Sequence, residues 1–218
     1  MHTTLSIDTC IGGGSAALFA DGAEIRAEDE LGRGKDDAPQ IHAVNEMLVS
    51  EGFRIDSPSE MIVTRGPGSF TGVRTGISIL RGLLRARDLA FLTCTVMEAM
   101  TAAVPETFDR CRTAIYAGKR EVAVQDFERQ GNHFVRAGSH FLIEKGLLFE
   151  NPGRLLVLGP GLESEVPEGT ETGEEVCFIN TGRNIARLAY RHVRSLPEGD
   201  LSKSLEPLYT RDFIVGRS

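Results

Sequence analysis

Several classes of protein are excluded by what this sequence lacks. No two of its four cysteines form a C-x-x-C pair, so neither a zinc knuckle nor a disulfide framework is indicated, and we expect reduced thiols in the cytoplasm. These cysteines are Cys10, Cys94, Cys111 and Cys177. No apolar run approaches the ~18 residues that a membrane span needs. No basic segment precedes an apolar one near the N-terminus, so we expect neither a membrane span nor a secretory signal.

Basic residues are also in deficit. The 218 residues include 24 Lys and Arg against 31 Asp and Glu, which gives a net charge of −7. A chain this acidic does not attract polyanions in general. We therefore do not expect it to hold nucleic acid by itself.

Histidine is scarce, and its spacing excludes one kind of metal site. The five histidines are His2, His42, His133, His140 and His192. Because no two of them lie four residues apart, no pair of histidine ligands can form on one helix. No Ser/His/Asp or Cys/His set is evident in the sequence either. We therefore predict no catalytic residues and no metal.

The elements that are present alternate between strands and helices. Apolar alternation and turn signals predict strands over 3–8, 15–20, 23–28, 60–64, 89–93, 111–116, 121–127, 155–158 and 176–179. Helical periodicity predicts helices over 39–51, 70–87, 97–104 and 182–193. This order favours an α/β fold in which a hairpin-led sheet is followed by a second, shorter set of strands. We divide the chain into an N-terminal half, 1–105, and a smaller C-terminal half, 106–218.

The most informative stretch reads GPGSFTGVRTG and begins at Gly66. Gly66 and Gly68 permit backbone angles that other residues resist, and Pro67 stiffens the turn between them. Ser69 or Thr71 can cap the helix that follows. The spacing is neither that of a Walker loop nor that of the dinucleotide fingerprint. A cradle for an anion or ligand and a purely structural turn are the two alternatives.

This stretch resembles the signature of the TsaB (YeaZ) family of proteins. Residues 5–9, LSIDT, resemble the family's opening strand, and residues 118–124, GKREVAV, resemble its short hairpin. Residues 207–211, PLYTR, resemble a motif near the family's C-terminus. The resemblance covers most of the chain and is stronger over 1–100 than over 101–218.

The resemblance implies an actin-like, Hsp70-type (ASKHA) α/β fold, with two ribonuclease-H-like halves of mixed sheets flanked by helices. It also implies a non-catalytic subunit that binds TsaD, which transfers the threonylcarbamoyl group to the adenosine 3′ of the anticodon, together with the ATPase TsaE. Contact with tRNA would come only through the complex, and the chain alone would form a homodimer. No cofactor is implied apart from a nucleotide at the partner interface. The alternatives are an independent small-molecule kinase or peptidase of the same superfamily, and a homodimeric module that has lost TsaD binding.

The resemblance further implies that helices 39–51 and 70–87 meet the partner. The second helix is apolar on more than one side, which suits burial against another chain, although burial inside this chain would produce the same pattern. Gly72 and Gly76 share a face that would let another helix or strand approach closely. We therefore predict that Gly76→Leu weakens partner binding and leaves the monomer folded. The predicted partner-binding residues are Ile41, Val44, Met47, Leu48, Gly72, Val73, Gly76, Ile77, Ile79, Leu80 and Leu83.

Asp8 is the one candidate for a degenerate nucleotide site. It ends the first predicted strand beside the glycine-rich turn 10–15. With Thr9 and Gly12 it would lie close to a bound phosphate. The other explanation, which we favour, is an acid that caps the turn at the end of a strand.

Two sets of arginines lie on predicted helices. Arg183, Arg187, Arg191 and Arg194 are spaced by four, four and three residues and form one stripe. Such a stripe would face solvent, tRNA phosphates or an acidic partner. The second set, Arg74, Arg81 and Arg85, has the same three explanations. The family's Arg-x-His-Ser/Thr pattern before the first helix is replaced here by residues 34–37, GKDD, and the family's aspartate is replaced near Tyr116.

Overall fold

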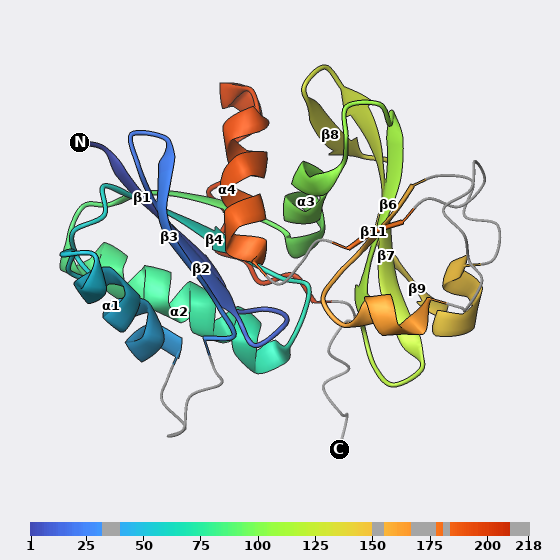
Figure 1. Ribbon diagram of the computed structural model, residues 1–218, viewed down its shortest axis with the longest axis horizontal. Helices are drawn as coiled ribbons and strands as arrows, with labels where there is room; N and C mark the ends of the chain where they lie inside the picture. The colour runs from blue at the N-terminus through green and yellow to red at the C-terminus, as the bar shows by residue number, and fades with distance from the viewer. Residues whose placement is uncertain (32–39, 150–154, 167–177, 181–183, 210–218) are drawn as a thin grey trace.

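A computed structural model of the chain describes residues 1–31, 40–149, 155–166, 178–180 and 184–209. Two β-sheets stand side by side, with two helices between them and two more outside the first sheet (Figure 1). The first sheet has the strand order β3-β2-β1-β4-β5. Its strands are β1 (Thr3–Asp8), β2 (Ser15–Ala20), β3 (Ala23–Asp29), β4 (Glu60–Thr64) and β5 (Ala90–Cys94). Strands β1 to β3 pair antiparallel, whereas β4 joins β1 in parallel and β5 joins β4 in parallel.

Glycine determines where the first sheet turns. The connection from β1 to β2 contains Gly12, Gly13 and Gly14, all with positive φ. The connection from β2 to β3 is the pair Asp21 and Gly22, also with positive φ at both positions. Two positive φ angles match the right-handed twist of a two-residue hairpin. The predicted hairpin-led start of the sheet is therefore confirmed.

Helices α1 (Gln40–Ser50) and α2 (Phe70–Ala86) cover one face of this sheet (Figure 1). The apolar residues of their inner faces recur every three or four positions, so they form one stripe on each helix. That stripe packs against β1, β2 and β4. The core between helices and sheet includes Leu5, Ile7, Leu18, Val44, Met47, Leu48, Met61, Val63 and Leu80.

The opposite face of the first sheet is covered by α4 (Ile185–Ser195), which comes from near the other end of the chain. The Ser6 hydroxyl donates to the carbonyl of Ala186 at 2.6 Å, and the amide of Ala186 donates to Ser15 Oγ at 3.0 Å. The Phe19 and Tyr190 rings stack with their centroids 3.6 Å apart. Helix α4 thus returns from the predicted C-terminal half to the first sheet. The division at 105/106 stays a prediction.

The second sheet has the order β11-β10-β6-β7-β8, and β9 pairs with β7. Its strands are β6 (Arg110–Tyr116), β7 (Glu121–Gln130), β8 (His133–Arg136), β9 (Phe141–Glu144), β10 (Leu155–Leu158) and β11 (Phe178–Asn180). One face packs on α4 and on α3 (Val96–Met100), which continues into the short helix η1 (Thr101–Ala103). The other face is covered by η2 (Lys145–Phe149) and η3 (Leu162–Glu165). A last short helix, η4 (Glu198–Asp200), follows α4.

The predicted elements agree with this architecture except in the second sheet. Strands β8 and β9, each 4 residues long, were not predicted. The predicted strand 176–179 and helix 182–193 begin outside the described residues. Within the described ranges, no helix is both long and apolar enough to span a membrane.

Candidate functional site

The signature turn lies against the carboxyl end of β1. Gly66 has φ +100 and precedes Pro67 through a cis peptide bond. The amide of Ser69 donates to the carbonyl of Cys10 at 2.7 Å, and the Ser69 hydroxyl caps α2 by accepting from the amide of Gly72 at 3.3 Å. The Thr9 hydroxyl donates to the carbonyl of Gly72 at 2.6 Å. Ser69 is therefore the cap of the helix.

Glycines in this stretch let α2 approach its own chain. A Cβ added at Gly72 would lie 2.0 Å from the carbonyl oxygen of Thr9, and one at Gly68 would lie 2.4 Å from that of Cys10. At Gly76 it would lie 2.6 Å from Thr9 Oγ1. The predicted close approach exists, but it is made by the end of β1 and not by a partner. Contrary to the prediction that Gly76→Leu leaves the monomer folded, we therefore expect it to destabilise the monomer, because a leucine would collide inside the chain.

Asp8 is fully buried at the end of β1. Its carboxylate accepts hydrogen bonds from the amide of Cys10 at 3.1 Å, from the amide of Ile11 at 3.5 Å and from the Thr64 hydroxyl. Burial raises the pKa of Asp8, although these hydrogen bonds oppose the rise. Such contacts are those of an acid that caps the turn, the explanation favoured from sequence.

A hollow of about 450 Å³ lies beside the residues that follow Asp8 in the chain. It is lined by Thr9, Cys10, Ile11, Gly12, Gly13, Gln40, Ser69, Thr71, Gly72 and Thr75. A second hollow of about 210 Å³ shares Gly12 and Ser69 with it and reaches Tyr116 and Pro160 of the second half. The fold thus brings the predicted site residues Thr9 and Gly12 together with the signature residues Gly68, Ser69 and Thr71. Their hydroxyls and backbone groups can donate and accept hydrogen bonds. Among the described residues, no group of three or more His, Cys, Asp or Glu side chains could hold a metal ion.

Three of the cysteines lie in the interior. Cys10 and Cys94 are buried free thiols, Cys111 is buried as well, and Cys177 lies outside the described residues. Burial raises the pKa of Cys10 and of Cys94 well above the usual range. Both thiols are therefore poor nucleophiles.

The residues that α1 and α2 expose to solvent are mostly not the ones predicted to bind a partner. Eight of the eleven predicted partner-binding residues are buried inside this chain, so they do not face a partner directly: Val44, Met47, Leu48, Gly72, Val73, Gly76, Ile77 and Leu80. Ile41, Ile79 and Leu83 are half-buried. Val49 was not predicted, yet it is 59% exposed. We call Ile41, Val49, Ile79 and Leu83 the outer α1–α2 face.

Two of the four arginines in the predicted stripe contact acidic residues of the same chain. The Arg187 guanidinium makes two hydrogen bonds of 2.7 Å to the Glu24 carboxylate. Arg194 pairs with Glu60 and donates to Thr4 Oγ1 at 3.1 Å. Arg191 is exposed, and Arg183 lies outside the described residues. Two members of this stripe therefore hold α4 to the first sheet.

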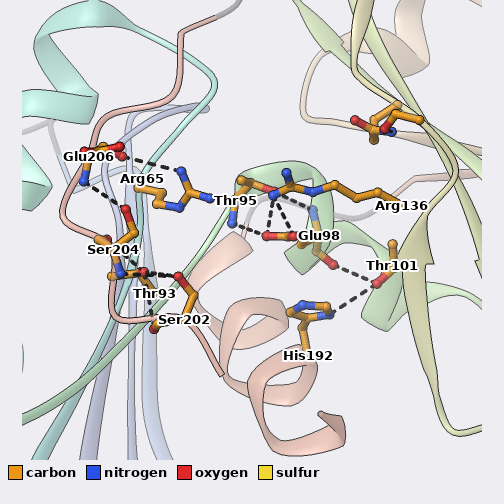
Figure 2. Close-up of polar contacts among 12 residues, drawn as sticks. Arg65, Thr93, Thr95, Glu98, Thr101, Arg136, His192, Ser202, Ser204 and Glu206 are labelled. Carbon is orange, nitrogen blue, oxygen red and sulfur yellow. Dashed lines mark hydrogen bonds and ion pairs between the residues drawn. The ribbon is translucent and has the colours of Figure 1, made fainter. Parts of the chain in front are cut away.

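A polar network connects α3 and α4 with strand β8 of the second sheet (Figure 2). Glu98 of α3 accepts from the amide of Thr95 at 2.7 Å and pairs with Arg136 of β8 at 2.7 Å. The Thr101 hydroxyl donates to the carbonyl of Glu98 at 2.7 Å and lies 3.4 Å from His192 Nδ1. The network thus connects α3, β8 and α4 with charged groups. Burial favours the neutral form of Glu98, but Arg136 and the hydrogen bonds from Thr95 outweigh it and lower the pKa.

His192 is expected to make the protein less stable in mild acid. Burial lowers its pKa from 6.5, and Arg136 and His133 add to the effect, although Glu98 opposes it. Below pH 6.5 the unfolded chain binds a proton that the folded chain resists, so the free energy of unfolding falls as pH falls. Between pH 7.5 and 5.5, the free energy of unfolding measured in urea should fall less for His192→Gln than for the wild-type chain. His42→Gln removes a histidine that is 61% exposed and should leave the fall unchanged. Equal slopes for His192→Gln and wild type would contradict this assignment.

This chain is similar to a known protein family and to curated proteins. The family model described as TsaD, tRNA N6-adenosine threonylcarbamoyltransferase, matches residues 40–200. A TsaB protein from Escherichia coli, named for tRNA threonylcarbamoyladenosine biosynthesis, is 31% identical over 59% of this chain and 56% of its own length. The TsaB protein from Haemophilus influenzae is 32% identical over 48% of this chain and 44% of its own length. The matches thus span about half the length of these curated relatives.

The fold is shared with a solved structure over nearly the whole chain. YeaZ from Pseudomonas aeruginosa superposes with a TM-score of 0.69 at 21% identity, covering 96% of this chain and 100% of that one. The predicted α/β fold of mixed sheets flanked by helices, of the actin-like (ASKHA) type, is confirmed. The predicted resemblance to the TsaB (YeaZ) family is confirmed as well.

Proposed function

This chain belongs to the tRNA N6-adenosine threonylcarbamoyltransferase (TsaD) family, and on that premise we propose that it acts as a TsaB-type accessory subunit. In this role it takes part in the biosynthesis of threonylcarbamoyladenosine in cytoplasmic tRNA. It binds the TsaD-type subunit without catalysing the transfer itself, and TsaE joins the two. It reaches tRNA only within that complex. The chain alone forms a homodimer.

The outer α1–α2 face is the observation that supports a binding role. Inner residues of both helices fill the core over the first sheet, and Ile79 and Leu83 pack against that core while they keep part of their surface exposed. Val49 leaves 59% of its surface in water. Apolar side chains gathered on the outside of a helix pair are typical of a surface that another chain covers. We therefore propose that the TsaD-type subunit docks here.

An independent kinase or peptidase of the same superfamily is the second candidate. It would use the hollow beside the signature turn. The lining of that hollow consists of hydroxyl, amide, thiol and apolar groups. Asp8, the acid of the predicted site, does not line it, is fully buried and accepts hydrogen bonds from Thr64 and two backbone amides. These contacts favour the accessory role. In our proposal the chain holds no cofactor alone, and a nucleotide binds only where the partner completes the site.

Substitution on the outer α1–α2 face is expected to weaken the complex. Val49→Asp would place a charge in an interface that the valine fills, so the Kd for the TsaD-type subunit should rise about 10-fold. Size-exclusion chromatography with light scattering and a binding titration would measure this change. Leu147→Asp is a matched control, because Leu147 is 49% exposed on η2 of the second sheet and its substitution should leave the Kd unchanged.

Two results would contradict the proposed function. One is clean separation of the wild-type chain from its TsaD-type subunit at micromolar concentration. The other is ATP hydrolysis or peptide cleavage by the purified chain alone. Formation of the complex would lead to reconstitution of tRNA modification with all subunits, which should require this chain.

A further inference from the structure

A third hollow, of about 350 Å³, lies where the end of α4, the short helix η1 and the β7–β8 hairpin meet. It shares no lining residue with the two hollows beside the signature turn. Its volume falls in the range of about 300–1,000 Å³ that small-molecule sites occupy in proteins. None of the predicted site residues lines it, so its own lining has to indicate what it could bind.

Arg129 of β7 is held in position at this hollow and keeps its charge. Its Nε donates to the carbonyl of Phe108 at 2.9 Å, and one terminal nitrogen donates to the carbonyl of Pro105 at 2.8 Å. The guanidinium carbon also lies 4.3 Å from the centre of the Phe134 ring. Because a guanidinium has five N–H donors, these two hydrogen bonds leave donors available. Carbonyl oxygens carry no formal charge, so they orient Arg129 without neutralising it.

Two further donors line the hollow from other parts of the fold. Arg191 is exposed on α4, and Asn132 is exposed in the two-residue turn between β7 and β8. Within the described part of the chain, neither side chain makes a hydrogen bond or an ion pair, and no carboxylate pairs with Arg129. Three side chains from α4, from β7 and from its turn therefore have hydrogen-bond donors to offer to a ligand.

The charges at this hollow give a positive excess in an acidic protein. Arg129 and Arg191 each carry a positive charge, whereas Glu106 is the acidic residue of the described lining. Asp200 lies outside that lining, with its carboxylate 3.7 Å from Nε2 of His133. The whole chain, by contrast, has a net charge of −7. A concave surface that keeps positive charge without a carboxylate partner favours an anionic ligand.

We propose that this hollow binds the phosphate group of a small phosphate monoester. Guanidinium groups form paired, charge-assisted hydrogen bonds with phosphate oxygens. Donors from three side chains suit the three free oxygens of a phosphate monoester better than the two oxygens of a carboxylate. Ala102 and Val104 line the same hollow and offer apolar surface to the organic part of the ester. Such a site goes beyond the proposed function, because it lies apart from both the signature turn and the outer α1–α2 face.

Titration of the full chain with glycerophosphate, followed by NMR, tests this site. We expect the backbone amide signals of Gly131 and Asn132 and the Nε–H signal of Arg129 to shift, with a Kd on the order of 1 mM. Acetate and glycerol are the matched probes, because one supplies a carboxylate and the other the organic part without phosphate. Both should bind at least about 10-fold more weakly than glycerophosphate.

Removal of one arginine identifies the hollow as the place of binding. Arg191→Gln should raise the Kd for glycerophosphate about 10-fold, because a hydrogen bond to a charged group is lost. Its circular dichroism and thermal unfolding should match the wild type, since Arg191 is exposed and unpaired within the described residues. Arg120→Gln removes an equally exposed arginine from the turn between β6 and β7 and should leave the Kd unchanged.

Three results would overturn the phosphate site. One is the same Kd for glycerophosphate in the wild type and in Arg191→Gln. Another is equally tight binding of acetate, which would mean that the hollow does not select phosphate. The third is that glycerophosphate shifts none of the three signals; if tRNA then shifts them, the arginines contact a nucleic-acid backbone instead. All three leave the proposed function standing, because the titration uses the chain without a partner.

Discussion

Replacing Gly72 with alanine is expected to destabilise the fold by about 3 kcal/mol or more. The added Cβ would lie 2.0 Å from the carbonyl oxygen of Thr9, which is backbone and belongs to the end of β1. Neither partner can rotate away, so α2 would have to move off the sheet. That movement would also break the 2.6 Å hydrogen bond from the Thr9 hydroxyl to the carbonyl of Gly72. Chemical denaturation of the purified variant would measure the loss.

Gly82→Ala is the matched control on the same helix. Nothing lies within 4 Å of a Cβ added at Gly82, and the position is exposed. Alanine there should stabilise the protein by about 0.5–1 kcal/mol, because glycine is a poor helix former. If Gly72→Ala and Gly82→Ala had similar effects, the close contact between α2 and Thr9 would be disproved.

Replacing Arg194 with methionine is expected to cost about 2 kcal/mol. Its guanidinium pairs with the Glu60 carboxylate, whose side chain is only 10% exposed. Methionine keeps the aliphatic part of the side chain and leaves the Glu60 charge with the Thr4 hydroxyl as its buried hydrogen-bond partner. The expected loss lies below that of a fully buried pair, because the Arg194 side chain is 37% exposed.

Two comparisons make this prediction specific. Arg191→Met changes an exposed arginine one turn earlier on α4 and should alter the free energy of unfolding by less than about 0.5 kcal/mol. Adding Glu60→Gln to Arg194→Met should restore part of the lost stability, since the unpaired buried charge is then removed. Equal losses for Arg191→Met and Arg194→Met would show that Arg194 holds nothing in place.

Several elements around the first sheet could be predicted from sequence, because they end or begin at residues that favour a turn or a helix cap. Asp21 and Gly22 form the turn between β2 and β3, and Ser69 caps α2 after the glycine turn. Such signals are local and act over two to four residues. The short strands β8 and β9 carry no signal of this strength, and they form because β7 offers an edge on which they pair.

The sequence could not predict what covers the apolar face of α2. Helical periodicity shows which residues share a face, but it does not show whether the chain's own core or a partner covers that face. Val73, Ile77 and Leu80 were assigned to a partner, yet the chain's own core buries them. Val49 was not predicted, because a single apolar residue does not form a second stripe on α1. It is nevertheless far more exposed than Val73, Ile77 or Leu80. Only the tertiary structure distinguishes the side that meets the sheet from the side that meets water.

The positions of charged residues in the sequence likewise do not identify their partners in the fold. This holds for Asp8 of the predicted nucleotide site and for the arginines of α4. Asp8 could be identified as the acid that ends β1, but its burial beneath Thr64 depends on a residue 56 positions away. Arg187 and Arg194 form a helical stripe in the sequence, whereas their partners Glu24 and Glu60 lie on the first sheet. A spacing of three or four residues reports on one helix and not on what docks against it.

The late return of α4 to the first sheet has a consequence for how the chain acquires its fold during synthesis. The strands of that sheet end at Cys94, but the helix that covers its second face begins only at Ile185. Until that helix has emerged from the ribosome, Ala17, Phe19 and Ile62 have no α4 to pack against. Contacts between such distant parts of a chain form slowly, and uncovered sheets are prone to aggregation. The N-terminal half is therefore expected to need the protection of a chaperone until α4 has been synthesised.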